Sequence, residues 1–95
     1  MLALPRELTA EQARATASEL VLAIQALPSG SPAALDGGAL EHFDSTALVV
    51  MVECQRAARR GARGFELSNI PPRLSQLAAL YGVAELLGLP AVPAA

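Results

Sequence analysis

Short apolar segments alternate with longer segments of helical periodicity, and this order limits the folds that are open to the chain. Strands are predicted at residues 2–4, 33–36 and 65–68, and a helical segment follows each of them. Strands and helices in alternation favour a largely parallel β-sheet against which the helices pack. Because 95 residues leave no room for a second hydrophobic core, we expect one α/β domain over residues 1–95.

The first two helices have recognisable N-terminal signals. Thr9 and Gln12 have the spacing of a capping box, which predicts a helix over residues 10–27. Asp44 and Ser45 are both favourable N-cap residues for a second helix. The residues that follow them are apolar on nearly every side, so the first turns of this helix are expected to be buried against a sheet or a partner.

The third helix is predicted to start at the Pro71–Pro72 pair, since proline is tolerated in the first helical turn. Gly82 stands where a left-handed C-cap belongs. Residues 83–87 can add one more helical turn, and the Pro- and Ala-rich residues 90–95 are expected to fray. The expected buried stripe of the helix consists of Ile70, Leu74, Leu77, Ala78 and Tyr81.

Charge and composition exclude several classes of function. The net charge is −2 and all seven basic residues are arginine, a balance that does not suit a general binder of nucleic acids. The longest apolar run, residues 47–52, is far shorter than the roughly 20 residues of a membrane-spanning helix. The N-terminus lacks a signal-peptide pattern, and the single cysteine cannot form an internal disulfide. We therefore expect a cytoplasmic protein with no nucleic-acid partner and no direct insertion into a membrane.

Residues that could support catalysis are few. His42 is the only histidine and lies three residues from Ser45, but neighbours in sequence rarely form a nucleophile–base pair. No group of His, Cys, Asp and Glu residues has metal-ligand spacing, and no glycine-rich phosphate-binding motif is present. The sequence thus predicts a protein that is not an enzyme and that uses no metal and no cofactor.

Four arginines are spaced to share one face of the second helix near its C-terminus, namely Arg56, Arg59, Arg60 and Arg63. One interpretation is a solvated stripe that complements the helix dipole, each charge contributing about 0.3–1 kcal/mol. The other is a patch that binds an anion or a protein partner. Without interleaved aromatic residues the stripe is a poor surface for single-stranded nucleic acid. We favour the solvated stripe.

The segment Asp44–Thr46 is the remaining candidate for a functional site. As structure, it is a cap followed by the first turn of a helix. As a site, it presents the hydroxyls of Ser45 and Thr46 at a helix N-terminus, where free N–H groups and the helix dipole favour negative charge. A phosphate on Ser45 would add about −1.5 to −2 charges there, although Asp44 would repel it. The cap is the preferred interpretation, and the phosphorylation switch stays open beside it.

The order and spacing of these segments resemble the STAS domain family, which includes bacterial anti-sigma-factor antagonists and regulatory domains of transporters. The resemblance covers about residues 2–89 and implies a STAS-like sandwich, with a mixed, mostly parallel sheet packed against helices in the order β-α-β-α-β-α. The segments that carry it are Leu35–Leu40, Asp44–Leu48, Phe65–Ser68, Pro72–Leu74 and Gly82–Val83.

Two departures from the family pattern are visible. Ala47 stands where the family usually has glycine, which would hinder a partner that needs a close approach to the backbone. We also expect that an N-terminal strand of the family is missing, because the chain opens at what resembles the second strand. Either the domain is minimal or Met1 is not the natural start. A lost edge strand would leave an unpaired edge and favour self-association.

Residues 77–83, with the sequence LAALYGV, resemble the terminal signature of the small cytoplasmic STAS subunit of the bacterial lipid-asymmetry ABC transporter. This implies a non-enzymatic subunit that binds and supports the ATPase, alongside the membrane permease, during phospholipid trafficking. Its place would be cytoplasmic and peripheral to the inner membrane through the complex. In that subfamily the hydroxyl residue that matches Ser45 lies at the ATPase interface. The implied contacts are Asp44, Ser45 and Thr46, with His42, Arg56 and Arg73 as secondary contacts.

Anti-sigma-factor antagonists of the same family provide the alternative. In that case a partner serine kinase, the anti-sigma factor, would phosphorylate Ser45, and the phosphate would expel that partner. The terminal segment with Tyr81 favours the transporter subunit, and Ala47 counts against the antagonist.

Overall fold

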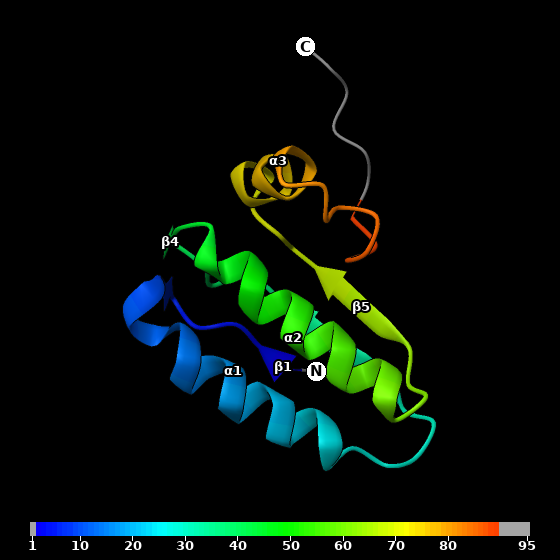
Figure 1. Cartoon of the computed structure of the whole chain (residues 1–95). Coiled ribbons are helices and arrows are strands. Elements are labelled where there is room, and N and C mark those ends of the chain that lie inside the picture. Colours follow the sequence, from blue (N-terminus) through cyan, green and yellow to red (C-terminus); the bar gives the residue numbers. More distant parts are fainter. Residues whose placement is uncertain (1, 90–95) are drawn as a thin grey trace.

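A computed structural model describes residues 2–89 of the chain (Figure 1). The predicted alternation of strands and helices is confirmed, and two further strands of two residues each were not predicted. The predicted fraying of residues 90–95 lies outside the described residues. The elements are β1 (Leu2–Ala3), β2 (Glu7–Leu8), α1 (Ala10–Gln25), β3 (Ala33–Asp36), β4 (His42–Phe43), α2 (Thr46–Arg60), β5 (Phe65–Ser68) and α3 (Pro72–Leu80).

The main sheet has the strand order β1-β3-β5, and β2 and β4 form a separate pair. Every strand pair within residues 2–89 is parallel. Leu35 in the central strand pairs with Leu2 on one side and with Leu67 on the other. Since side chains alternate along a strand, Ala33 and Leu35 both face the core, where they are fully buried.

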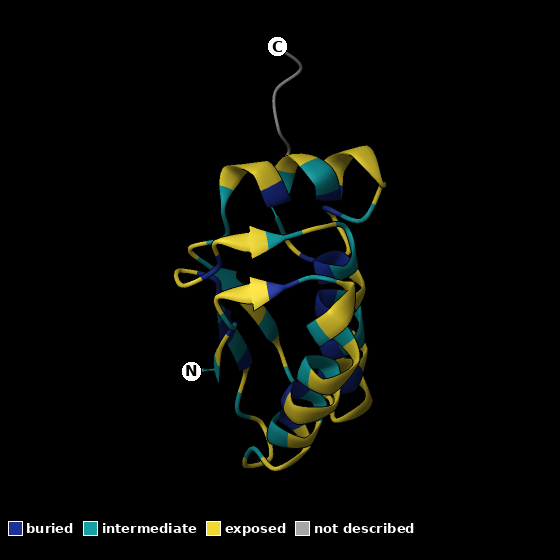
Figure 2. Cartoon of the chain, turned by 90° about the vertical axis from the view of Figure 1, so that its left-hand side faces the viewer, coloured by how far each residue is buried: buried dark blue, intermediate teal, exposed yellow. Residues whose placement is uncertain are grey.

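Helices α1 and α2 run side by side over the main sheet in Figure 1 and pack extensively on each other. Figure 2, turned by 90°, shows the strands toward one side, the two long helices toward the other, and α3 across one end. Helix α1 ends at Gln25, two residues before the predicted end, and buries Leu20 and Ile24. The core between the layers is aliphatic, because the chain has only three aromatic residues.

The N-terminal signal of α1 forms as predicted. The Gln12 side chain reaches back, and its Oε1 accepts the backbone N–H of Thr9 at 2.9 Å. This bond gives a partner to a backbone N–H that the helix cannot satisfy within itself.

The connection from β5 into α3 is held by an amide–carboxylate bond. Asp36 Oδ1, at the end of β3, accepts hydrogen bonds at 3.0 Å from the Gly38 N–H and from Asn69 Nδ2. Asn69 has a φ of 54°, in the left-handed region that asparagine tolerates better than most residues. Gly37 lies close against Ile70, where a β-carbon would come within 2.9 Å of the Ile70 side chain. These contacts fix the position from which α3 starts.

Helix α3 ends as predicted, but Tyr81 is not part of its buried stripe. Gly82 adopts a φ of 75°, and the N–H groups of Gly82 and Val83 donate to the carbonyls of Ala79 and Ala78 at 3.1 and 2.9 Å. This is the Schellman arrangement, which reverses the chain directly after the helix. Tyr81 therefore stands at the helix end and is 59% exposed, so the prediction that it belongs to the core is wrong.

The segment after α3 returns toward the sheet. The Leu87 N–H donates to the Val83 carbonyl at 3.0 Å, which confirms the predicted helical turn. Leu87 itself is buried in the core. The turn holds residues 81–86 beside α2, and this placement creates the site described next.

Candidate protein-binding groove

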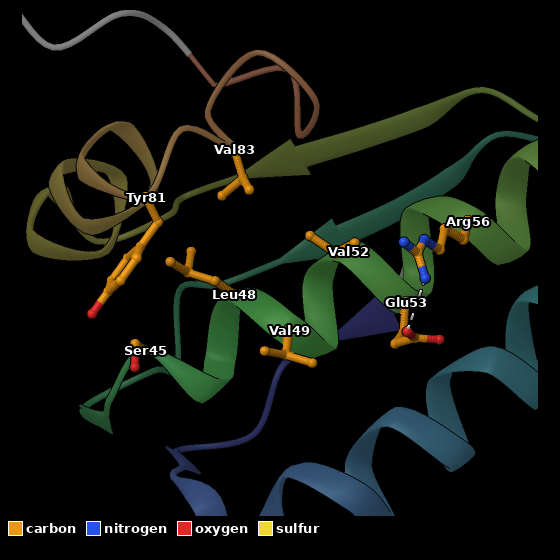
Figure 3. Close-up of a pocket in the computed structure, with 8 residues that line it drawn as sticks. All are labelled: Ser45, Leu48, Val49, Val52, Glu53, Arg56, Tyr81 and Val83. Atoms are coloured by element: carbon orange, nitrogen blue, oxygen red, sulfur yellow. Dashed lines mark ion pairs between the residues drawn. The ribbon is translucent and has the colours of Figure 1, made fainter.

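A groove of about 390 Å³ lies between one face of α2 and the chain segment that follows α3 (Figure 3). The α2 residues that line it recur at intervals of three and four, which is the spacing of a single helical face. The opposite wall comes from the segment after α3. The lining residues are Ser45, Leu48, Val49, Val52, Glu53, Arg56, Tyr81 and Val83.

Large apolar side chains are open to solvent along this groove. Val49 is 59% exposed, whereas its neighbour Val50 is 1% exposed on the core side of the same helix. Figure 3 shows the Tyr81 ring extending from the end of α3 toward Ser45, on the same side of α2 as Leu48. The expected burial of the first turns of α2 is thus confirmed for the face toward the sheet, whereas Val49 lies on a face that the described residues leave open. Val49 and Tyr81, each 59% exposed, thus lie on opposite walls of the same groove.

Asp44, not Ser45, caps α2. Asp44 Oδ1 accepts the Thr46 N–H at 2.9 Å and also accepts the Thr46 hydroxyl. These hydrogen bonds stabilise the ionised carboxylate and lower the pKa of Asp44. Asp44 Oδ2 also accepts the Ala10 N–H at 3.4 Å, so one side chain connects the starts of both long helices. Asp44 and Thr46 therefore shape the helix start and do not line the groove.

The Ser45 hydroxyl is available at the rim of the groove. Ser45 already has helical backbone angles, with φ −63° and ψ −17°, and its side chain makes no capping bond. Among residues 2–89 no group forms a hydrogen bond with this hydroxyl. Of the three predicted contact residues, Ser45 is the one that can reach a partner in the groove.

The predicted secondary contacts are separated by the fold. Arg56 lines the groove, and its Nη1 lies 3.6 Å from Glu53 Oε1. His42 is exposed on β4, paired with Glu7, and Arg73 is exposed on the first turn of α3. Neither His42 nor Arg73 lines the groove.

Six lining residues were not among the predicted contacts, namely Leu48, Val49, Val52, Glu53, Tyr81 and Val83. Val49 and Val52 follow Ser45 by four and seven residues, which places them on the same helical face, and this periodicity could have identified them. Tyr81 could not be assigned in this way, because its side-chain direction depends on the reversal at Gly82. Ala47 is fully buried in the core. It does not line the groove, and its effect on a partner stays a prediction.

The arginine stripe is shorter than predicted. Helix α2 ends at Arg60, and Ala62 takes a φ of 54°, which turns the chain back. Arg63 consequently leaves the stripe, and its Nη2 donates to the Leu27 carbonyl at 2.8 Å. The three remaining arginines, Arg56, Arg59 and Arg60, are exposed on the last turns of α2.

A cluster of metal ligands, a membrane-spanning helix or a reactive cysteine would indicate another type of function for residues 2–89. In the part of the chain from residue 2 to 89, no three His, Cys, Asp or Glu side chains come together as metal ligands. Over the same residues no helix is both long and apolar enough to cross a membrane. Cys54 is a fully buried residue of α2, and this burial raises the pKa of its thiol to about 12, so the group is a neutral part of the core.

Comparison with known proteins agrees with this architecture. The family model described as "Mlab, STAS domain" matches residues 2–88, nearly the whole chain. No curated protein matches the chain. STAS domains generally lack catalytic activity and mediate interactions between proteins. Because the family model matches residues 2–88 and the fold has parallel strands under two packed helices, the chain belongs to the STAS domain family.

Proposed function

We propose that this protein is a non-catalytic subunit that binds and supports the ATPase of a phospholipid-trafficking ABC transporter, on the cytoplasmic side of the inner membrane. The observation that carries the proposal is the open apolar groove with the Ser45 hydroxyl at its rim. The hydroxyl residue that matches Ser45 is the one expected at the ATPase interface from the family resemblance. The resemblance of residues 77–83 to the transporter subunit involves Tyr81, the opposite wall of the same groove.

The chemistry of the groove fits a protein partner better than a small substrate. Tyrosine with its ring exposed and its backbone held at a helix end is a typical anchor of protein interfaces. Burial of apolar area against a partner removes it from water, which is the main favourable term in most protein association. His42 does not line the groove, and among residues 2–89 it forms no hydrogen bond with the Ser45 hydroxyl. These features support binding as the activity of the site.

The test is reconstitution with the ATPase and permease of the phospholipid transporter from the same cells. Val49→Asp places a charge in the groove, and Ser45→Trp fills its rim. With both variants, much less ATPase should co-purify, and the rate of ATP turnover by the reconstituted transporter should fall. Leu22→Asp is the matched control, because Leu22 is 66% exposed on α1, outside the groove. Full association and full ATPase activity in both groove variants would disprove the proposal.

The alternative is an anti-sigma-factor antagonist, and the observation in its favour is the unpaired Ser45 hydroxyl. A phosphate on Ser45 would stand beside the Asp44 carboxylate and the apolar wall of the groove, so it would oppose docking of a partner. This alternative predicts a mass gain of one phosphate with the cognate kinase and ATP, which Ser45→Ala abolishes. Phosphorylation that persists in Ser45→Ala would exclude this serine as the switch.

A further inference from the structure

A second hollow continues the exposed face of α2 beyond the apolar groove. Its volume is about 490 Å³, and exposed Leu86 from the turn after α3 forms part of its wall. Its lining residues are Gln55, Arg56, Arg59, Arg60 and Leu86. We call this hollow the arginine groove.

The arginine groove carries uncompensated positive charge. Arg56 is paired with Glu53, but within residues 2–89 neither Arg59 nor Arg60 takes part in an ion pair or a side-chain hydrogen bond. The helix dipole accounts for a preference for cations in this last turn. It does not account for a hollow that has an apolar wall at Leu86 beside these cations. A planar guanidinium in such a place can bind a carboxylate through two hydrogen bonds.

The two grooves are continuous, because Arg56 lines both of them. One surface therefore runs along α2 from Ser45 to Arg60, apolar in its first half and cationic in its second. At 1.5 Å per residue this path is about 22 Å long. Its walls are side chains of α2 and of residues 81–86, so it offers no free strand edge. A surface of this shape suits a helix lying in a groove.

The geometry points to an amphipathic, acidic helix of about 15 residues in the protein partner as the occupant of this surface. The apolar residues of this partner helix occupy the apolar groove, between Val49 and Tyr81, and its carboxylates face Arg59 and Arg60. The inference rests on the proposed function only in taking the apolar groove as the docking site. It specifies the chemistry of the partner's segment, whichever protein supplies that segment.

An anionic membrane is the other surface that could attract these arginines, and the molecule favours the protein helix. The positive charge is confined to a hollow, whereas a bilayer is a flat surface. The chain as a whole has a net charge of −2. Glu53 lines the apolar groove, and Glu85 is adjacent in sequence to Leu86, which lines the arginine groove. A bilayer of anionic lipids would be repelled by the remainder of the surface.

Site-specific photo-cross-linking in the full chain tests the inference. A benzophenone amino acid is placed at position 49, at position 60 and, as a control, at position 22, and the cross-linked peptides are sequenced by mass spectrometry. We expect positions 49 and 60 to reach one partner segment at points roughly 10–15 residues apart, with Asp or Glu at the end cross-linked from position 60. Position 22 should reach neither end.

A binding measurement with the identified segment as a synthetic peptide completes the test. The double substitution R59E/R60E should weaken binding at least tenfold, and the loss should shrink in high salt. R14E is the matched control, since Arg14 is an exposed arginine on α1 outside both grooves.

The outcomes separate this inference from the proposed function. A partner that is not an ATPase but supplies an acidic helix overturns the proposed function and supports the inference. An ATPase segment without carboxylates opposite position 60, or no cross-link from position 60 while position 49 reacts, overturns the inference alone. No cross-link from either position counts against both. Sedimentation with phosphatidylglycerol vesicles that R59E/R60E abolishes would assign the arginines to a membrane and overturn the inference.

Discussion

Val49 and Val50 are neighbours on α2 with opposite environments, and substituting each by alanine tests whether the groove is open. Val50 is 1% exposed, so Val50→Ala removes two fully buried methyl groups. The lost transfer free energy is about 1.6 kcal/mol at about 0.8 kcal/mol per group. A cavity of roughly 50 Å³ adds about 1.2 kcal/mol. The better helix propensity of alanine offsets about 0.5 kcal/mol of this cost, so the free energy of unfolding should fall by about 2 kcal/mol.

Val49 is 59% exposed, and Val49→Ala removes methyl groups that already contact water. The free energy of unfolding should change by less than about 0.5 kcal/mol. Urea and thermal unfolding of the two purified variants provide the measurement. Val50→Ala should lower the Tm by roughly 8–16 °C, given about 4–8 °C per kcal/mol in a domain of this size. Equal destabilisation by the two substitutions would refute the reasoning, because Val49 would then be covered in the free protein and the groove would not be open.

Three further predictions concern the residues that shape the groove. Hydrogen bonds to Asp36 and Asp44 hold the pKa of each carboxyl below its ordinary value. The stability that these carboxylates contribute is therefore complete above the unfolded-state pKa and is lost as the pH falls below about 4. Urea unfolding between pH 3 and pH 6 should show this decline in the free energy of unfolding, and D44N should make the decline smaller. Ala47→Gly should cost about 1–2 kcal/mol through lost helix propensity and a lost buried methyl group, and it should leave partner binding unchanged when compared at equal folded fraction. Gly82→Ala meets no neighbouring atom, so its cost of about 1 kcal/mol is backbone strain at a φ of 75°; a loss above about 3 kcal/mol in thermal unfolding would point to a contact that this geometry does not contain.

Local signals in the sequence identified the three helices and the strands β1, β3 and β5. The alternation of β3 and of β5 has the period of a strand, and the capping residues Thr9 and Asp44 precede the two long helices. These features depend on near neighbours in the chain, so they can be read without knowledge of the fold. The two-residue strands β2 and β4 carry no such pattern, because a pair of residues has no periodicity.

The sequence by itself determined the family-like order of elements, the aliphatic core and the presence of Ser45 at the start of an apolar helix. Only the tertiary structure decided which face of that helix stays open. Val49 and Val50 are the same residue type, and they differ because the main sheet and α1 cover one side of α2 and not the other. Tyr81 and Arg63 likewise left their predicted faces, because the chain reverses at Gly82 and at Ala62. Periodicity predicts which residues share a face, but which face finds a neighbour is decided by packing between elements that are distant in the sequence.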